Sequence, residues 1–265
     1  MTCATSKEGM EQPRSQPVKA VGVIPARWAS TRLPGKSLVS LCGKPMVQWV
    51  VERAQQAKSL AKVIVATDDR RILEAVESFG GDAVMTRSDH PSGTDRIAEA
   101  TCDIDADLVV NIQGDEPLVA PELIDGLVAA MRADLTWDMG TAAARIESEA
   151  DLNDASVVKV VWAADHRALY FSRSVIPCVR DASMQGRVPH WRHLGIYAYR
   201  RSFLERIVAA PPCALEEAEK LEQLRALHLG GRMIVLETID HGIGVDTPED
   251  VSRAEQLIRE AESHG

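Results

Sequence analysis

Length, composition and charge limit the kinds of protein that this sequence can encode. Its 265 residues suffice for one large α/β domain, or for a core domain with an insertion. Aromatic residues make up only 4% and the net charge is −9, which disfavours a nucleic-acid partner because such binding depends on neutralising phosphates. Five scattered cysteines without a C-x-x-C pair argue against a disulfide framework or a zinc site, and they favour a cytoplasmic location.

The N-terminal residues 1–18 differ in character from the rest of the chain. They are polar, mixed in charge and lack the apolar stretch of a signal peptide, so we expect a disordered extension. Residues 19–265 would then form a single domain. No apolar run in it reaches the length of a membrane span, and we expect no membrane partner.

Strand and helix patterns alternate through the first half of the chain. Short apolar runs predict buried strands over residues 20–25, 62–67 and 108–113. Helical spacing of apolar residues predicts helices over 46–58, 69–79 and 121–131. This alternation is typical of βαβ units on a parallel sheet, so we predict an α/β fold.

The pattern loosens after about residue 136. Strands are predicted over 139–144, 157–161, 194–199 and 233–237, and helices over 216–229 and 248–262. We therefore expect an inserted β-rich region at about 136–200, and a central sheet that is mixed but mostly parallel.

A basic loop follows the first strand, over residues 25–36. It carries Arg27, Arg32 and Lys36, and Pro34-Gly35 supplies a turn. Two guanidinium groups and one ammonium group, at the carboxyl end of a strand, can clamp a polyphosphate. The loop lacks the P-loop spacing, and a solvated surface loop is the alternative.

Two acidic residues also follow strands. Asp115 comes after the third strand and Gly114, and Asp246 comes after a short apolar pair near the C-terminus. Mg²⁺ binds to a few carboxylates plus substrate phosphates, so these positions predict a metal site beside the basic loop. Alternatively both residues are helix caps, although Thr247 suits the cap before Pro248 better.

Three further segments contain candidate ligand contacts. S-G-T-D-R, from Ser92 to Arg96, is a turn that leads into a helix, and capping and ligand binding are both open for it. In H-L-G-I-Y the alternation of a strand puts His193 and Tyr197 on one face. Glu222 and Gln223 lie on a predicted helix that would ordinarily present a solvated charged face.

Together these segments resemble the 3-deoxy-D-manno-octulosonate (Kdo) cytidylyltransferases, also called CMP-Kdo synthetases. The resemblance covers nearly everything after the N-terminal tail. Its blocks are I-P-A-R-W-A-S-T-R-L-P-G-K, L-C-G-K-P-M, V-A-T-D-D, S-G-T-D-R, N-I-Q-G-D-E-P, Y-F-S-R-S-V-I-P, H-L-G-I-Y, L-E-Q-L-R and G-V-D-T-P-E-D.

The resemblance implies a fold, a reaction and a site. The fold would be a three-layer sandwich of the nucleotide-diphospho-sugar transferase type (Rossmann-like), in a homodimer. The inserted β-rich region at about 136–200 would then serve substrate binding and dimerisation. The reaction would join CTP and Kdo into CMP-Kdo and pyrophosphate, for lipopolysaccharide assembly. The implied nucleotide-binding residues are Pro25, Ala26, Arg27, Arg32, Lys36, Ser92, Gly93 and Gln113. Those for the sugar acid are Arg173, His193, Tyr197, Glu222 and Gln223, and those for Mg²⁺ are Asp115 and Asp246.

Within this set we expect Arg27, Lys36, Asp115 and Asp246 to act in catalysis, since phosphoryl-type transfer depends on positioning and charge neutralisation. No side chain is an obvious general base. Arg173 would neutralise the carboxylate of the sugar acid. Two alternatives stay open: a cytidylyltransferase for another acidic sugar, such as an amino-Kdo or a sialic-type acid, and a catalytically silent nucleotide-binding homologue.

Overall fold

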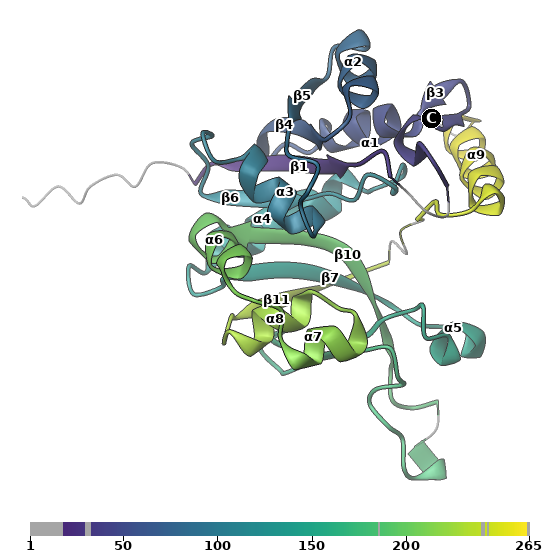
Figure 1. Cartoon of the computed structure of the whole chain (residues 1–265). Coiled ribbons are helices and arrows are strands. Elements are labelled where there is room, and N and C mark those ends of the chain that lie inside the picture. The colour runs from purple at the N-terminus through teal and green to yellow at the C-terminus, as the bar shows by residue number, and fades with distance from the viewer. Residues whose placement is uncertain (1–17, 30–32, 185, 240–241, 243, 264–265) are drawn as a thin grey trace, which may run out of the picture.

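One mixed sheet organises the chain (Figure 1). The computed structural model describes residues 18–29, 33–184, 186–239, 242 and 244–263, so the predicted N-terminal extension lies almost wholly outside the described residues. Nine strands of these residues form the sheet in the order β11-β7-β10-β6-β1-β4-β5, with β8 attached to β10 and β9 to β8. The strands are β1 (Ala20–Ala26), β4 (Leu60–Thr67), β5 (Asp82–Met85), β6 (Leu108–Asn111), β7 (Met139–Arg145), β8 (Lys159–Trp162), β9 (Ala168–Ser172), β10 (Trp191–Arg200) and β11 (Met233–Thr238).

Most neighbouring strands along this order run parallel. β1 pairs with β4 and β6, β4 with β5, and β7 with β11, all in parallel. The long strand β10 is antiparallel to both β6 and β7, which makes the sheet mixed. The predicted mixed, mostly parallel sheet is confirmed.

Helices cover both faces of the sheet, and alternate residues of each strand point to opposite faces. In β1, Ile24 packs with the core beneath α1, α2 and α4, whereas Val23 packs with the core beneath α3, α6 and α8. This burial on both faces explains why β1 is continuously apolar. The helices are α1 (Met46–Ala54), α2 (Arg70–Ser78), α3 (Gly93–Ala100), α4 (Pro121–Ala133), α5 (Glu149–Asn153), α6 (Arg201–Ala209), α7 (Ala214–Glu219), α8 (Gln223–His228) and α9 (Pro248–Ser263). The three-layer sandwich is thus confirmed.

In a third, smaller hydrophobic core, the C-terminal helix α9 packs against the N-terminal part of the chain. Ala254 and Ile258 of α9, with Val245, are buried against Leu41 and Met46. Leu41 belongs to the two-residue strand β2 (Ser40–Leu41), which pairs with β3 (Lys44–Pro45). Figure 1 shows α9 beside β3, so residues just before α9 come close to the loop after β1.

The predicted helix over 216–229 is wrong: the segment contains two helices. α7 ends at Glu219, the next residue, Lys220, has a left-handed backbone at φ 53°, and α8 begins at Gln223. A non-glycine residue in that conformation cannot continue a helix. The break turns α8 against the sheet, where Leu224 and Ala226 are fully buried or nearly so.

The predicted β-rich region at 136–200 divides into two parts. β7 and β10 lie inside the central sheet, between β11 and β6. β8 and β9 form an antiparallel extension on β10. A short 3-10 helix, η2 (Ala182–Met184), lies in the long connection between β9 and β10.

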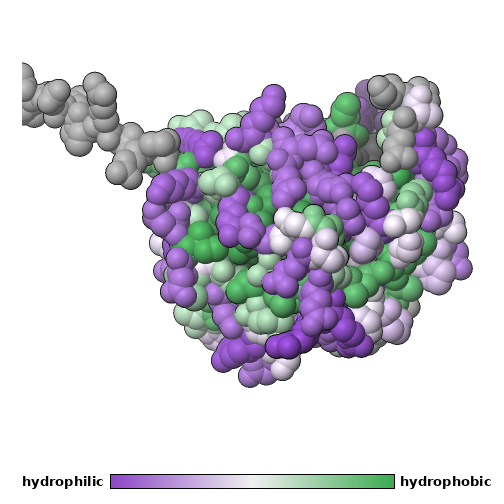
Figure 2. Space-filling view, turned by 90° about the horizontal axis from the view of Figure 1, so that it is seen from above, coloured by the Kyte–Doolittle hydropathy of each residue, from purple (hydrophilic) through white to green (hydrophobic). Residues whose placement is uncertain are grey.

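The outer surface is mixed in character. Seen from above, hydrophilic residues cover most of the molecule and hydrophobic ones form separate patches (Figure 2). No helix among the described residues is both long enough and apolar enough to span a membrane.

Candidate active site

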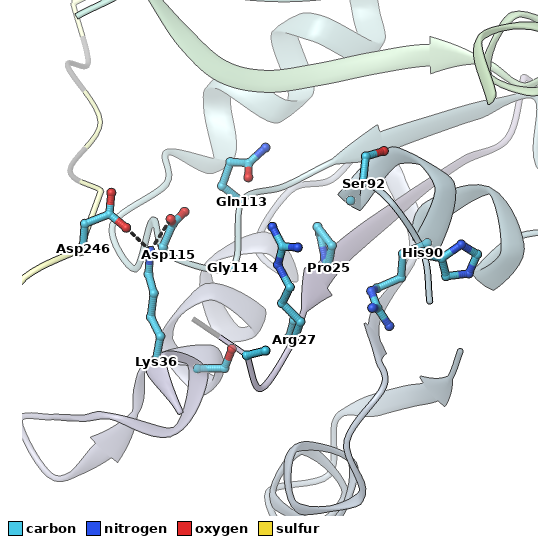
Figure 3. A pocket seen from close by; sticks show the side chains of 14 residues that line it. Pro25, Arg27, Lys36, His90, Ser92, Gln113, Gly114, Asp115 and Asp246 are labelled. Carbon is cyan, nitrogen blue, oxygen red and sulfur yellow. Dashed lines mark hydrogen bonds and ion pairs between the residues drawn. The ribbon is translucent and has the colours of Figure 1, made fainter. Parts of the chain in front are cut away.

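A pocket of about 440 Å³ opens at the carboxyl ends of β1 and β6 (Figure 3). Ligands of open α/β sheets bind at this edge. Nine residues predicted from sequence line it: Pro25, Ala26, Arg27, Lys36, Ser92, Gly93, Gln113, Asp115 and Asp246. Five lining residues were not predicted as site residues: Ala29, Ser37, His90, Arg96 and Gly114.

The loop after β1 is held by packing outside the pocket. Gly35 has φ 67° and lies against the Trp28 ring, which a Cβ on Gly35 would approach to 3.0 Å. The Arg71 guanidinium stacks on the Trp28 ring, 3.3 Å from its centroid, and pairs with Asp69 at 2.6 Å. These contacts fix the turn from which Lys36 starts the 3-10 helix η1 (Lys36–Leu38). Arg32 lies outside the described residues.

One ammonium group joins the two predicted metal ligands. Nζ of Lys36 lies 2.5 Å from Oδ2 of Asp115 and 2.6 Å from Oδ1 of Asp246, as the dashed lines in Figure 3 mark. The three residues come from η1, the loop after β6 and the segment before α9. Thr247 and Asp250 form the reciprocal cap of α9: Thr247 N donates to Asp250 Oδ2 at 2.9 Å, and Asp250 N donates to Thr247 Oγ1 at 3.3 Å.

Gly114 lets the ends of β1 and β6 meet. A Cβ at this position would lie 2.9 Å from the carbonyl oxygen of Pro25, too close for any side chain. The glycine therefore brings Asp115 beside the basic loop.

The other wall of the pocket is the start of α3. Ser92 caps this helix, since its Oγ accepts from Asp95 N at 3.3 Å, so the capping interpretation holds for a residue that also lines the pocket. Arg96 is buried beneath it and donates to Asp68 Oδ2 at 2.7 Å and to Thr86 Oγ1. The membership of Arg96 in S-G-T-D-R was a signal that could have revealed it. His90 is buried against Glu99, a contact with no pattern in the sequence.

Gln113 connects this pocket to the face of β10 on which His193 and Tyr197 were predicted to lie. Its amide nitrogen donates to the carbonyl oxygen of Gly195 at 2.7 Å. The rings of His193 and Tyr197 are in contact, with centroids 5.3 Å apart, so the prediction that they share a face is confirmed.

Burial controls the ionisation of these two rings. It lowers the pKa of His193 to about 3. The imidazole Nε2 shares a 3.0 Å hydrogen bond with Thr141 Oγ1, and the Phe171 ring meets it edge-on. Burial, with the nearby Tyr199 and Glu222, raises the pKa of Tyr197 well above its ordinary value. Both rings are therefore neutral at pH 7.

Glu222 and Gln223 lie near Tyr197, around a second cavity of about 20 Å³ that Tyr199 also lines. Glu222 accepts a hydrogen bond from Thr94 Oγ1 on α3, and Gln223 is buried. The two residues thus face the molecule's interior and not the solvated surface expected of an ordinary charged helix.

Arg173, the remaining predicted contact for the sugar acid, lines neither cavity. Its guanidinium donates to the carbonyl oxygens of Glu219 at 2.7 Å and Ala155 at 2.9 Å. Its backbone N–H donates to the Glu219 carboxylate at 2.9 Å. Its role as the partner of a sugar carboxylate stays a prediction.

The donor set fits a hard divalent cation. Two carboxylates converge within 2.6 Å of one cationic atom and are about a third exposed, which leaves room for water or phosphate oxygens as further ligands. No group of three or more His, Cys, Asp or Glu side chains in the described part of the chain could hold a metal ion. A metal here would therefore need further oxygens from water or from a substrate.

Comparisons with known proteins agree with this geometry. Residues 21–237 match the family model for cytidylyltransferases. A 3-deoxy-manno-octulosonate cytidylyltransferase of Geobacter metallireducens is 49% identical, over 91% of this chain and 99% of that protein. One of Syntrophobacter fumaroxidans is 52% identical, over 88% and 94% of the two chains.

A solved structure gives the same result. CMP:2-keto-3-deoxy-manno-octonic acid synthetase, complexed with CTP, has a TM-score of 0.88 and 45% identity, over 92% of this chain and 99% of that one. The sheet and pocket are thus those of a nucleotidyltransferase. The chain belongs to the 3-deoxy-manno-octulosonate cytidylyltransferase family, as its sequence motifs predict.

Proposed function

We propose that this protein transfers the cytidylyl group of CTP to the anomeric hydroxyl of Kdo, giving CMP-Kdo and pyrophosphate. The observation that carries the proposal is the convergence of Arg27, Lys36, Asp115 and Asp246 in one pocket, in a chain of this family. We further propose that the reaction takes place in the cytoplasm and supplies lipopolysaccharide assembly. The four cysteines of the described residues carry free thiols, which supports the location.

The pocket can orient a triphosphate for in-line attack on the α-phosphorus. Arg27, exposed at its rim, and the Lys36 ammonium would neutralise the charge that develops on the leaving pyrophosphate. The start of α3, with Ser92 and Gly93, offers backbone N–H groups at the opposite wall. Gln113, Ala26 and Ser92 would enclose the nucleoside.

We propose Mg²⁺ as the cofactor, with Asp115 and Asp246 as its protein ligands. When bound, it would neutralise phosphate charge and increase the acidity of the attacking hydroxyl. The protein's own contribution is to hold the two carboxylates at fixed positions beside the triphosphate, through Gly114 and through the capped start of α9.

The sugar acid would lie on the β10 side of Gln113. Tyr197, Glu222 and Gln223 line the interior there, and His193 packs behind Tyr197. The His193 ring would hold the Tyr197 ring in position through their contact, and burial keeps the imidazole neutral.

The first prediction tests the reaction. With Mg²⁺ and CTP, the purified protein should release pyrophosphate when Kdo is supplied, and faster than with sialic-type or amino-Kdo acceptors at equal concentration. Asp115→Ala should lower turnover by about a hundredfold or more, since it removes one of two carboxylates on the metal. Its circular dichroism should match the parent protein.

Faster pyrophosphate release with another sugar acid would show that this other acid, and not Kdo, is the preferred acceptor. CTP binding in calorimetry without release from any acceptor would indicate the silent homologue. Near-normal turnover of Asp115→Ala would contradict the metal assignment.

A further inference from the structure

The Lys36 ammonium lies between the carboxylates of Asp115 and Asp246, at the position proposed for the metal ion. Its ammonium lies 2.5 Å from Asp115 Oδ2 and 2.6 Å from Asp246 Oδ1, and its side chain is only 13% exposed. The side chains of Asp115 and Asp246 are 32% and 34% exposed, so the lysine side chain is the most enclosed of the three. Figure 3 shows it pointing at both carboxylates.

This arrangement conflicts with metal binding to the free protein. Two carboxylates and one ammonium carry a net charge of −1, which is poorly matched to a divalent ion. A cation that displaced the ammonium would leave Lys36 beside a positive ion in a partly enclosed site, where charges are weakly screened. A triphosphate removes the conflict, because its oxygens can accept the ammonium and bind the metal.

The side chain of Lys36 can make this change without moving the loop. Its backbone is fixed, since Lys36 N donates to Leu33 O at 3.1 Å and Val39 N donates to Lys36 O at 3.1 Å. The four-carbon stem carries a compact charge through rotatable bonds, whereas a guanidinium would need a planar, two-point partner.

We propose that Lys36 makes cation binding depend on the nucleotide. In the free protein its ammonium group pairs with Asp115 and Asp246 and blocks cation binding to them. When a triphosphate binds, the ammonium pairs with the phosphate oxygens instead, and the two carboxylates can then bind the cation. The pocket therefore selects the metal–nucleotide complex over the metal alone. The proposal rests on the proposed triphosphate site. By linkage, the nucleotide must raise metal affinity by the same factor as the metal raises nucleotide affinity.

Manganese binding tests the proposal, measured by electron paramagnetic resonance on the full-length protein without a sugar acid, so that no turnover occurs. Lys36→Gln removes the competing charge. Without nucleotide it should bind Mn²⁺ at least about tenfold more tightly than the parent protein, within the usual range of coupling between sites. The gain in Mn²⁺ affinity on adding CTP should be large in the parent and small in the variant.

Three further variants make the result specific. Lys44→Gln removes another lysine with a carboxylate partner, Glu52 at 2.8 Å, which lies outside the pocket, and should leave Mn²⁺ affinity unchanged. The double variant Lys36→Gln with Asp115→Asn should lose the increase in Mn²⁺ affinity that Lys36→Gln produces without nucleotide. Lys36→Met should show the same increase in Mn²⁺ affinity as Lys36→Gln. Circular dichroism checks the fold of each variant.

Equal Mn²⁺ affinity of Lys36→Gln, Lys36→Met and the parent protein, with all three folded, would overturn the proposal. So would a gain that survives Asp115→Asn. These titrations do not depend on which sugar acid is the acceptor. A protein that released no pyrophosphate could still show the metal-affinity change, so the two failures are distinguishable.

Discussion

His193 shows how one partly buried side chain can make the protein's stability depend on pH. Its ring lies between Phe171, Tyr197 and Thr141, and no carboxylate contacts it among the interactions described. Burial lowers its pKa to about 3, whereas a histidine of the unfolded chain titrates near 6.5. The unfolded state therefore binds an additional proton below about pH 6.5, and stability falls as the pH drops from 6.5 towards 3.

Replacing this ring should flatten part of that pH dependence. Between pH 7 and pH 5 the parent protein should lose about 1 to 2 kcal/mol more unfolding free energy than His193→Gln, whose side chain does not titrate. Urea unfolding at the two pH values measures the difference. Equal losses in both proteins would show that His193 accepts a proton in the folded state at pH 5.

Residues at strand ends were the predictable part of the site. Arg27 directly follows β1, and Asp115 comes four residues after the end of β6, so the sequence alone places them at the same edge of the sheet. His90 and Arg96 depend on contacts with Glu99 and Asp68, which are made by folding and leave no periodic pattern. The arrangement of Lys36 between two acids is also tertiary, since it joins residues 210 positions apart.

At the scale of elements, α3 connects the two halves of the site. Ser92 and Gly93 line the larger pocket, and the next residue, Thr94, donates a hydrogen bond to Glu222 at the start of α8. Thr94 is buried at 4% exposure, and its hydroxyl also contacts Tyr199. Thr94 is thus placed to orient Glu222 toward the predicted sugar-acid side.

Loss of this hydroxyl should affect one substrate selectively. Thr94→Val should raise the KM for the sugar acid by about tenfold or more, the usual cost of a lost hydrogen bond to a charged group, and leave the KM for CTP within about twofold. Thr94→Ser keeps the hydroxyl and should restore the parent KM. A parallel rise of both KM values would point to general damage to α3 instead.

Some helices and strands could be predicted from the sequence, and others could not. The parallel strands β1 and β6, and residues 63–67 of β4, are buried on both faces and form apolar runs in the sequence. α6 was not predicted, because its N-cap is Arg200, which makes no side-chain cap, so the usual start signal is missing. β5 has four residues at the edge of the sheet, too few for a clear pattern.

The whole molecule is predicted to pair with a second copy. Leu169 and Met184, both within the region expected to dimerise, are 50% and 43% exposed. We expect light scattering to give about twice the chain mass of 28.9 kDa. Leu169→Asp with Met184→Asp should shift the mass toward that of one chain, because burying a carboxylate in an interface is costly.

Met85→Asp is a matched control, since Met85 is 47% exposed on β5, at the far end of the sheet from β11. It should leave the mass unchanged. A single-chain mass for the parent protein at micromolar concentration would contradict the prediction.

The position of Asp246 also sets the order in which the site can form during protein synthesis. The sheet strands, the basic loop and Asp115 all precede residue 239, whereas Asp246 is placed only when Val245, Ala254 and Ile258 pack onto Leu41 and Met46. A growing chain on the ribosome can therefore complete its sheet before its acidic pair exists. The packing of α9 is therefore the last step that positions Asp246, and activity begins only after the main fold has formed.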